Sequence, residues 1–555
     1  MTTVGVWTLA LALAYTLFLI VGGRRLGVRS TARNSYFVGG RSFSSMTVAF
    51  CITGLFSGSS FIAILELSYR TGVSAAWYGV AEITQILLIA TLLVGPLRRR
   101  LVVTVSGLIG DRFGRTARGL GGAITAFTFP MWSVATAIAF ATALSAVTGL
   151  SIDGSVVFTA VLLLVFLWGG GMQSVAFTQT ANCAVFALML AAGTAAVLID
   201  PGWSALSNLS VSAPQLADPT SAGVPLIVAW FGTFVVNVIL AQAAFQMAMS
   251  CRTPEEGRAG MVWAAGLAVP FIVLGVAVGV AAALTVPGEQ LGLLGAAQYV
   301  AEVLPAPAAA LFFLGLWACA LGWGAPCQFS GATSLGRDVG SALNPSATEV
   351  DLIRYTRWSL VLLTGLMILF GLLRTEQSAW WNILAWTLRN GATLAPVLAV
   401  LFWPAATRLS AQAALVVGFL AGLSWYHLGD WDPTMFHYGI HPVWVGMSLN
   451  ITTLVLVTMA TSTWRLATRP VHRRRGALAL LAALVLTAVT AASWDQLHPL
   501  GLTGLAIFTS VVLTAISAFQ LVRQPSSIHP PGSGTVDQRE EGVQGAEPST
   551  TRATF

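Results

Sequence analysis

The residues best suited to do chemistry in this 555-residue chain are two charges inside long apolar runs, Glu82 and Arg389. At 1.5 Å per residue each lies roughly 12–14 Å from the predicted outer end of its run, near the middle of a bilayer core about 30 Å thick. Charges at that depth are costly, usually face a cavity and usually find a partner. We therefore expect Glu82 and Arg389 to line one polar cavity and to meet directly or through a bound solute. The alternative is a buried pair that only clamps two helices.

A second feature is the stretch "GLFSGSSFIA" at positions 54–63, where glycines and serines interrupt an apolar run. Loosened backbone in lipid is tolerated only where it lines a cavity or is buried in protein, and secondary transporters use such breaks to bind solutes and cations. The run five spans later also contains polar or flexible residues, namely Gly232, Thr233, Asn237, Gln242 and Gln246. A lone interruption would fit a packing face of small residues equally well. Two interruptions favour a transporter, with Ser60 and Gln242 as further candidate solute-binding residues.

The composition indicates which solvent surrounds these runs. The chain is 56% hydrophobic and 9% charged, with a mean hydropathy of +0.79, whereas soluble domains carry about 25% charged residues. A membrane span needs about 20 apolar residues. By that rule about fifteen runs are predicted, at 4–22, 46–69, 74–95, 119–149, 154–170, 174–199, 226–250, 260–286, 307–335, 356–373, 380–403, 409–428, 442–464, 476–493 and 500–522.

The basic residues gather in alternate loops. This pattern follows the positive-inside rule and places the N-terminus outside and the C-terminus in the cytoplasm of a cell-membrane protein. It also accounts for the net charge of +7 without a nucleic-acid partner. The five cysteines lack metal-ligand spacing. From residue 523 the chain turns polar, so 1–522 is predicted as the transmembrane domain and 523–555 as a disordered tail.

The chain resembles the sodium/solute symporters in several segments that occur in family order. They are "YFVGGRSFSSMTVAFCITGLFSGSSFIAILELSYRTGVSAAWY", "LWGGGMQSVAFTQTANCAVF", "AQAAFQMAMSCRTPEEGR", "ATSLGRDVG" and "GATLAPVLAVLFWPAATRLSAQAALVVGFLAGL". The resemblance implies an all-α integral membrane protein with the five-plus-five inverted-repeat core of the leucine transporter. The core repeats would cover about 46–199 and 226–403. The first and sixth core helices would be broken, at 53–60 and near 231–237.

The resemblance also implies a sodium site between the first and eighth core helices. Backbone carbonyls of Thr53 and Phe56 would supply part of it, and two hydroxyl side chains of the eighth core helix would supply more. Those two positions here are Gly322 and Trp323, neither of which offers a side-chain oxygen. An alignment slip that brings Ser330, Thr333 or Ser334 into the site is the alternative.

Two further positions differ from the family pattern. Gln179 stands where the family has an acidic residue, and Ala241 replaces the aspartate of its "DQ" pair. Oxygen or negative charge is thus lost where sodium would need it. We therefore expect transport to depend weakly on sodium or not at all. A proton carried by Glu82 would then be the coupling ion, or the protein would exchange or equilibrate solutes.

The sequence predicts a secondary transporter that moves a small polar organic solute by alternating access. If the solute has a carboxylate, it should meet Arg389. The alternative is a solute-binding receptor or an uncoupled facilitator. No catalytic constellation lies in the runs, so an enzyme is not expected, nor is a cofactor or an obligate protein partner. Glu66 and Arg70 are interpreted as a surface pair near the outer end of their helix.

Overall fold

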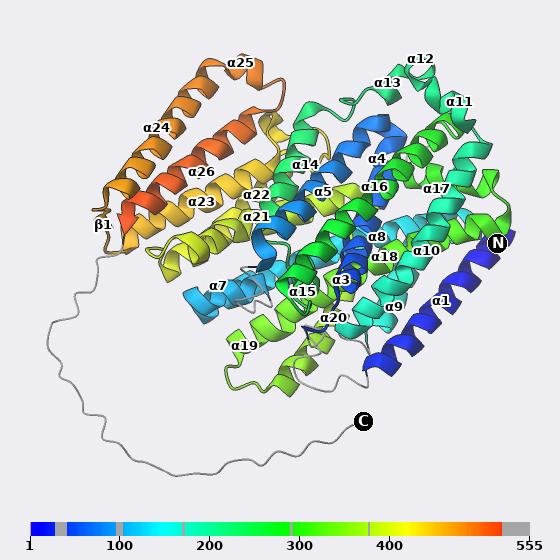
Figure 1. Cartoon of the computed structure of the whole chain (residues 1–555), viewed down its shortest axis with the longest axis horizontal. Helices are drawn as coiled ribbons and strands as arrows, with labels where there is room; N and C mark the ends of the chain where they lie inside the picture. Colours follow the sequence, from blue (N-terminus) through cyan, green and yellow to red (C-terminus); the bar gives the residue numbers. More distant parts are fainter. Residues whose placement is uncertain are drawn as a thin grey trace, which may run out of the picture.

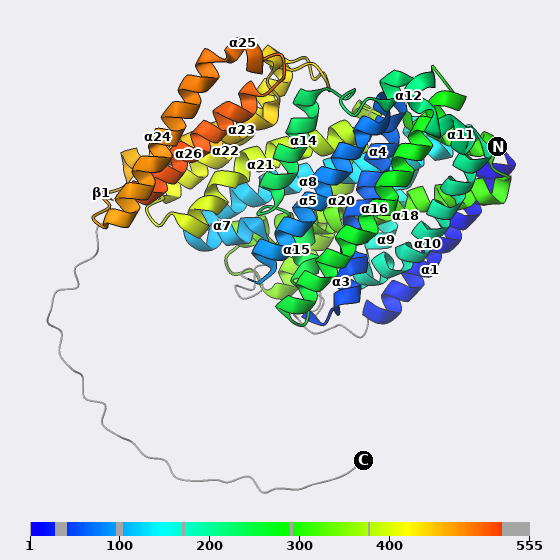
Figure 2. The same ribbon diagram turned by 45° about the horizontal axis from the view of Figure 1, so that its top comes forward.

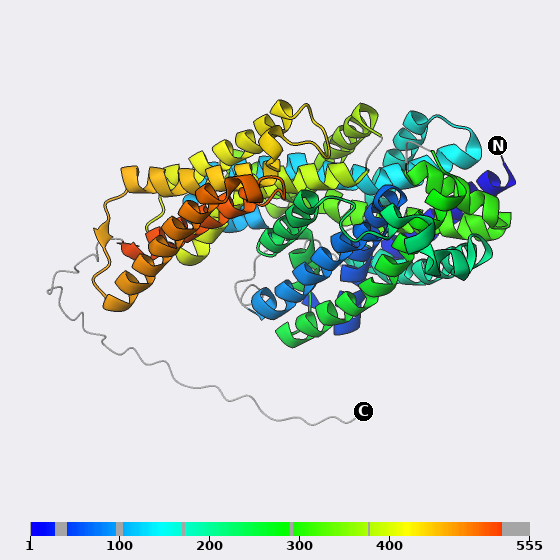
Figure 3. The ribbon, with the colours of Figure 1, turned by 90° about the horizontal axis from the view of Figure 1, so that it is seen from above.

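The computed structural model describes residues 2–27, 41–95, 104–168, 172–288, 292–375 and 378–523, and nearly all of them are helical. The long helices run side by side as a tilted bundle (Figures 1–3). Helix α1 (Thr3–Gly27) lies at one edge, and α24 (Pro470–Ala492) with α26 (Thr503–Leu521) lies at the opposite edge (Figure 1). A two-residue ladder joins β1 (Arg465–Leu466) to β2 (Val522–Arg523).

Twelve helical stretches of the described chain are long and apolar enough to cross a membrane, or thirteen if one bent pair counts as a span. The stretch Ser45–Leu93 contains two of the predicted runs, and Ile152–Leu167 (α9) is shorter than a usual span. Each predicted run therefore coincides with helix, but the predicted number of about fifteen spans is not confirmed.

The first interruption takes the form of a π-helix. It separates α3 (Ser45–Ile52) from α4 (Gly58–Thr71) and covers Thr53–Ser57. A 3-10 turn, Gly72–Ala75, then leads into α5 (Ala76–Leu88), which continues as a second π-helical segment, Ile89–Leu93. Single π-helical turns inside α-helices are frequent at functional sites.

The second interruption is a true bend, and it lies at 238–241, just after the predicted positions 231–237, which are helical. Helix α14 (Val224–Asn237) and helix α15 (Gln242–Ala248) differ in direction by 47° across four residues. At the bend the N–H of Gln242 donates to the carbonyl of Leu240 at 2.7 Å, so the regular helical ladder stops there.

The remaining elements complete the bundle and its short end helices. The long ones are α8 (Arg115–Thr148), α10 (Met172–Ile199), α16 (Pro254–Thr285), α18 (Ala306–Thr333), α20 (Glu349–Leu373), α21 (Ser378–Phe402), α22 (Arg408–Leu428) and α23 (Pro442–Thr461). The shorter ones are α7 (Val105–Phe113), α11 (Gly202–Ser207), α12 (Leu209–Ser212), α13 (Pro214–Ala217), α17 (Gly292–Val303), α19 (Gly340–Leu343) and α25 (Trp494–Leu497). The N-terminus, α11–α13 and α25 lie at one end of the bundle, and α7 and α19 lie at the other (Figure 1).

Polar residues before the apolar runs explain where many helices begin. Their side-chain oxygens accept the first free N–H groups, which is the usual role of serine and threonine at a helix start. Such caps are made by Ser44, Thr104, Ser151, Thr253, Thr348 and Thr407. Helix α21 is different, because Glu66 of α4 accepts hydrogen bonds from the backbone N–H groups of Ser378 and Ala379.

This contact corrects the interpretation of Glu66 as a surface residue. Glu66 is buried, and its carboxylate accepts a third hydrogen bond from the Ser378 hydroxyl at 2.6 Å. The surface position predicted from the i,i+4 spacing to Arg70 is therefore wrong. The side chain faces another helix, whose position the local sequence does not reveal.

Glycines bring α21, α22 and α23 into backbone contact. A Cβ atom placed on Gly418 would lie 1.9 Å from the carbonyl oxygen of Gly391, and one on Gly446 would lie 3.3 Å from that of Gly418. The three helices can pack this closely only with glycine at position 418.

The predicted boundary of the tail lies close to the last described element. Arg523, the first residue of the predicted tail, pairs with Arg465 in the small ladder. The rest of the predicted tail, 524–555, lies outside the described residues. The division into two core repeats stays a prediction.

Candidate functional site

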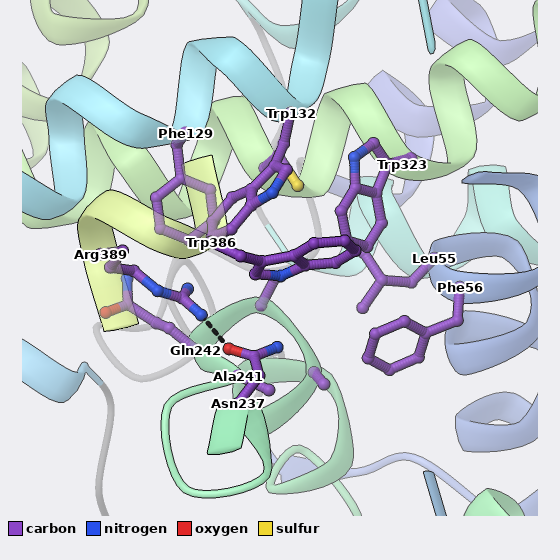
Figure 4. Close-up of a pocket in the computed structure, with 13 residues that line it drawn as sticks. Leu55, Phe56, Phe129, Trp132, Asn237, Ala241, Gln242, Trp323, Trp386 and Arg389 are labelled. Carbon is purple, nitrogen blue, oxygen red and sulfur yellow. Dashed lines mark hydrogen bonds between the residues drawn. The ribbon is translucent and has the colours of Figure 1, made fainter. Parts of the chain in front are cut away.

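A small pocket lies where the two helix interruptions meet (Figure 4). Leu55 and Phe56 reach it from the π-helical segment, and Asn237, Ala241 and Gln242 reach it from the bend between α14 and α15. Helices α8, α18 and α21 close the other sides. Interrupted helices that meet at one cavity are how inverted-repeat transporters build their solute sites.

Five aromatic rings line the pocket. They belong to Phe56, Phe129, Trp132, Trp323 and Trp386. The centroid of Trp132 lies 6.2 Å from that of Trp323 and 6.0 Å from that of Trp386. The cavity between them measures about 20 Å³, which is room for one water molecule. A solute can therefore enter only when these rings or their helices move apart.

Arg389 is the charged group of the pocket and is buried on α21. Its guanidinium donates to the side-chain oxygen of Asn237 (Figure 4) and lies 4.4 Å from the ring centroid of Trp132, in cation–π contact. The Nε of Arg389 and the indole Nε1 of Trp323 are buried without a hydrogen-bond partner among the described residues. The described pocket lining contains no acidic side chain, so the site offers unused donors and a positive charge.

Glu82 does not pair with Arg389, which corrects the expectation of a direct contact. Its carboxylate accepts a hydrogen bond from Ser60 on α4, whereas Arg389 bonds to Asn237. The described lining of the pocket includes neither Glu82 nor Ser60. The structure thus brings Arg389 and Gln242 to the pocket and holds Ser60 and Glu82 together outside its lining.

Gln242 lines the pocket but its amide already has partners. The Gln242 oxygen accepts from the backbone N–H of Val105 at 3.0 Å. Its nitrogen donates to the carbonyl of Ser330 at 3.1 Å and to the hydroxyl of Ser334 at 2.9 Å. Gln242 therefore ties α15 to α7 and α18 on the side predicted to be cytoplasmic.

The residues expected at a sodium site are arranged around an amide instead. The Gln179 nitrogen on α10 donates to the carbonyl oxygen of Gly322 on α18 at 2.6 Å. The Gln179 oxygen lies against Gly54, where a Cβ atom would approach it to 2.0 Å. A Cβ on Gly322 would in turn lie 2.4 Å from the carbonyl oxygen of Gly54. The π-helical segment, α10 and α18 are thus in direct contact at this point.

A second amide extends the same contact. Asn182 donates to the carbonyl of Ala318 at 3.0 Å, and Tyr15 of α1 donates to the Asn182 oxygen at 2.8 Å. Two carbonyls of α18 therefore receive N–H donors, which compete with a cation for the same oxygens.

The other predicted cation-site residues lie elsewhere. Phe56 and Trp323 direct their rings to the pocket, 6.0 Å apart between centroids. Thr53 is buried, and its hydroxyl has no partner among the described residues. Ser330 and Ser334 bond to Gln246 and Gln242, and Thr333 donates to the carbonyl of Phe329 in its own helix.

Sequence reasoning did not single out Trp132, Trp386 or Asn182. Trp386 had a usable signal, because it stands three residues before Arg389 and such residues share a helix face. Trp132 is one of 19 tryptophans, and nothing in its surroundings in the sequence sets it apart. Its ring is fixed by a hydrogen bond of 3.2 Å to the carbonyl of Asn382 on α21.

Paired helix interruptions around a buried charged pocket, in a bundle of membrane-spanning helices, define a secondary transporter. The chain belongs to the sodium:solute symporter family, whose profile matches residues 36–418. This confirms the family predicted from the sequence. The family consists of transporters rather than enzymes, and membership suggests sodium as the coupling ion.

Individual relatives agree with this assignment. The chain is 22% identical to a monocarboxylic acid transporter of Corynebacterium glutamicum over 441 residues, which cover 72% of this chain and 79% of the relative. It is 23% identical to the uncharacterized symporter YwcA of Bacillus subtilis over 459 residues, 76% of this chain and 87% of that one.

A solved structure confirms the fold class. A sodium-coupled sialic acid symporter in its outward-open state superposes with a TM-score of 0.68, at 16% identity, over 82% of this chain and 98% of the other. At that identity the likeness concerns the fold alone. The protein is therefore a multi-pass, all-α membrane protein with a transporter fold.

Proposed function

We propose that this protein moves a small organic acid with one carboxylate across the cell membrane by alternating access. The observation that carries the proposal is Arg389, a buried guanidinium with an unused Nε donor in a pocket whose described lining holds no acidic group. A planar guanidinium can bind a carboxylate through two parallel hydrogen bonds. The relative named as a monocarboxylic acid transporter supports the same class of solute.

The walls of the pocket restrict the rest of the solute. Beyond Arg389, Asn237, Gln242 and the thiol of Cys327 the lining is aromatic or aliphatic, and the amide of Gln242 is engaged elsewhere. A solute with several hydroxyl groups would leave them without partners, at about 1–3 kcal/mol for each buried group. The site therefore favours a short, apolar body attached to one carboxylate.

Ligand binding by purified protein is the first test. Pyruvate, butyrate and benzoate should raise the melting temperature, whereas butyramide, a neutral analogue of butyrate, should not. Losing the charge-assisted contact in Arg389→Gln should weaken binding by about 2–4 kcal/mol, roughly 30- to 1,000-fold. Arg389→Lys is the matched control that keeps the charge and loses the paired geometry. Equal binding of acids and amides, unchanged in Arg389→Gln, would contradict the proposal.

Transport is separated from mere binding by uptake into proteoliposomes. A transporter should exchange radiolabelled acid for unlabelled acid across the vesicle membrane. Binding without exchange or accumulation would instead identify the receptor, and exchange without accumulation under any gradient would identify the uncoupled facilitator.

We also propose that sodium does not drive this transport through the family's usual site. Gln179 and Asn182 present N–H groups to the carbonyls of Gly322 and Ala318, and Gly322 and Trp323 supply no side-chain oxygen. Accumulation driven by an imposed sodium gradient, and abolished when potassium replaces sodium, would refute this proposal.

The proposed orientation has the N-terminus outside the cell and the C-terminus in the cytoplasm. The arginine-rich loops support it, as does the common end of the bundle shared by the N-terminus, α11–α13 and α25 (Figure 1). Protease protection of tags at the two ends would test it. The solute and the lipid bilayer are the expected partners.

A further inference from the structure

A buried polar cluster on α4, on α5 and on the last residue of the π-helical segment before α4 has no role in the site described so far. Its centre is Glu82, 1% exposed, which accepts a hydrogen bond from Ser60. Ser57 and Gln85 are also fully buried. The hydroxyl of Ser57 and both amide atoms of Gln85 have no hydrogen-bond partner among the described residues. Unpaired buried polar atoms are uncommon and call for an explanation.

The helix geometry places these residues together. Helices α4 and α5 are joined by the short turn Gly72–Ala75 and run in opposite directions. Ser60 meets Glu82, and the position of Gly79 meets Ile64 one turn further toward that turn. Because the two helices are antiparallel, position 57, three residues before Ser60, and position 85, three residues after Glu82, lie at the same level of the bundle. Ser57 and Gln85 occupy those positions.

No basic side chain neutralises Glu82 among the described residues. Arg389 is bound to Asn237, and α14, which packs on α5, has no ionisable residue. Tyr78 lies one turn away on α5 itself. The other ionisable residues on packed helices stand toward helix ends: Glu66, Tyr69 and Arg70 on α4, and Glu255, Glu256 and Arg258 on α16.

A lone carboxylate at this depth is costly unless it is neutralised. One bound proton removes the charge and turns one carboxyl oxygen into a donor, for which Ser57 and Gln85 offer unused acceptors. Resting on the transport proposed above, we infer that Glu82 binds a proton that accompanies the solute. The proton comes from water on one side, forms an O–H bond with the carboxylate and is released to water on the other.

The cluster is connected to the solute pocket through two short paths. Ser60 lies four residues after Phe56, whose ring lines the pocket. Tyr78, one turn before Glu82, packs on Trp386 with ring centroids 6.3 Å apart. Movement of these rings to admit a solute would change the surroundings of Glu82. One proton moved with one monocarboxylate carries no net charge, so uptake should not respond to the membrane potential.

The test uses full-length protein in proteoliposomes and, as solute, the acid among pyruvate, butyrate and benzoate with the largest thermal shift. Accumulation is measured under an inward proton gradient, under an inward sodium gradient and without a gradient. Exchange is measured separately in vesicles preloaded with unlabelled acid. The wild type should accumulate solute with the proton gradient alone. Glu82→Gln should lose at least about ten-fold of that accumulation while exchange continues, because an amide cannot release the proton.

Glu66→Gln is the matched control, because Glu66 is a second buried carboxylate and accepts three hydrogen bonds from the start of α21. Accumulation by the Glu66→Gln variant should still depend on the proton gradient. Proton-driven accumulation in Glu82→Gln, sodium-driven accumulation in the wild type, or loss of exchange in folded Glu82→Gln would each overturn the inference. If Glu82→Gln does not fold, Ser60→Ala is used instead, because it keeps the Glu82 carboxyl group and removes the hydrogen-bond donor that stabilises the charged carboxylate. Glu82 should then hold its proton at higher pH, and uptake should extend to higher pH. An unchanged pH profile of uptake would count against a role of Glu82. If the wild type exchanges acid but does not accumulate it under a proton gradient, only this inference is refuted. If the wild type does not exchange acid at all, the transport proposal is refuted.

Discussion

Glu66→Ala should destabilise the junction between α4 and α21. The Glu66 carboxylate accepts from the N–H of Ser378 at 3.1 Å, from the N–H of Ala379 at 3.0 Å and from the Ser378 hydroxyl at 2.6 Å. Alanine would leave two buried backbone donors unpaired, at about 1–3 kcal/mol each and so about 2–6 kcal/mol in all. A cavity of about 330 Å³ borders Glu66 and Ala379, and water entering it would replace part of the loss. We therefore expect about 2–4 kcal/mol.

Thermal unfolding in detergent, followed by a thiol-reactive dye, would measure this change. Four of the five cysteines are buried, so most of the reaction with the dye should follow unfolding. Glu66→Gln keeps one acceptor and should show a smaller loss, and Glu302→Ala, at an exposed position on α17, should show almost none. A melting temperature of Glu66→Ala equal to that of the wild type, or a loss matched by Glu302→Ala, would refute the reasoning.

Three further predictions concern packing, closure and coupling. Gly418→Ala should lower the melting temperature strongly because its new methyl group meets the Gly391 carbonyl, whereas Gly365→Ala, with open space around it, should be neutral; equal melting temperatures would contradict this. In a variant without the other four cysteines, Gln242→Ala should speed maleimide labelling of the pocket residue Cys327. The reason is that α15 loses its hydrogen bonds to Val105, Ser330 and Ser334. An unchanged labelling rate would show that these hydrogen bonds do not keep the pocket closed. Gln179→Leu should reduce exchange equally in sodium and in potassium, since it removes the bond to Gly322, and a reduction confined to sodium would point to a cation at this position.

Much of the fold was predictable because it depends on local apolar content. Each run of apolar residues coincides with helix, and the first interruption falls within the predicted stretch 53–60. The second lies at 238–241, just after the predicted positions 231–237, which belong to α14. Arg389 and Gln242 were also found at the pocket, as their depth and their helix suggested. These features depend on the sequence nearby, or on the cost of burying a charge in lipid.

The partners of these residues were not predictable, because they depend on how the helices are rotated against one another. Depth along a run gives the height of Glu82 and Arg389 in the bilayer but not the direction in which each side chain points. Glu82 therefore meets Ser60 rather than Arg389. Glu66 meets a residue 312 positions away, which its four-residue spacing to Arg70 could not reveal.

The small volume of the pocket has a consequence for the ion gradients across the membrane. A carrier with a wide aqueous passage in the absence of solute would let protons and small ions leak across the membrane and dissipate the gradients that drive other carriers. Here five aromatic rings line a space of about 20 Å³ between the two helix interruptions, which is room for one water molecule rather than for a row of them. The idle protein should therefore act as an electrical insulator, and its conductance in a planar bilayer without solute should not exceed that of the lipid.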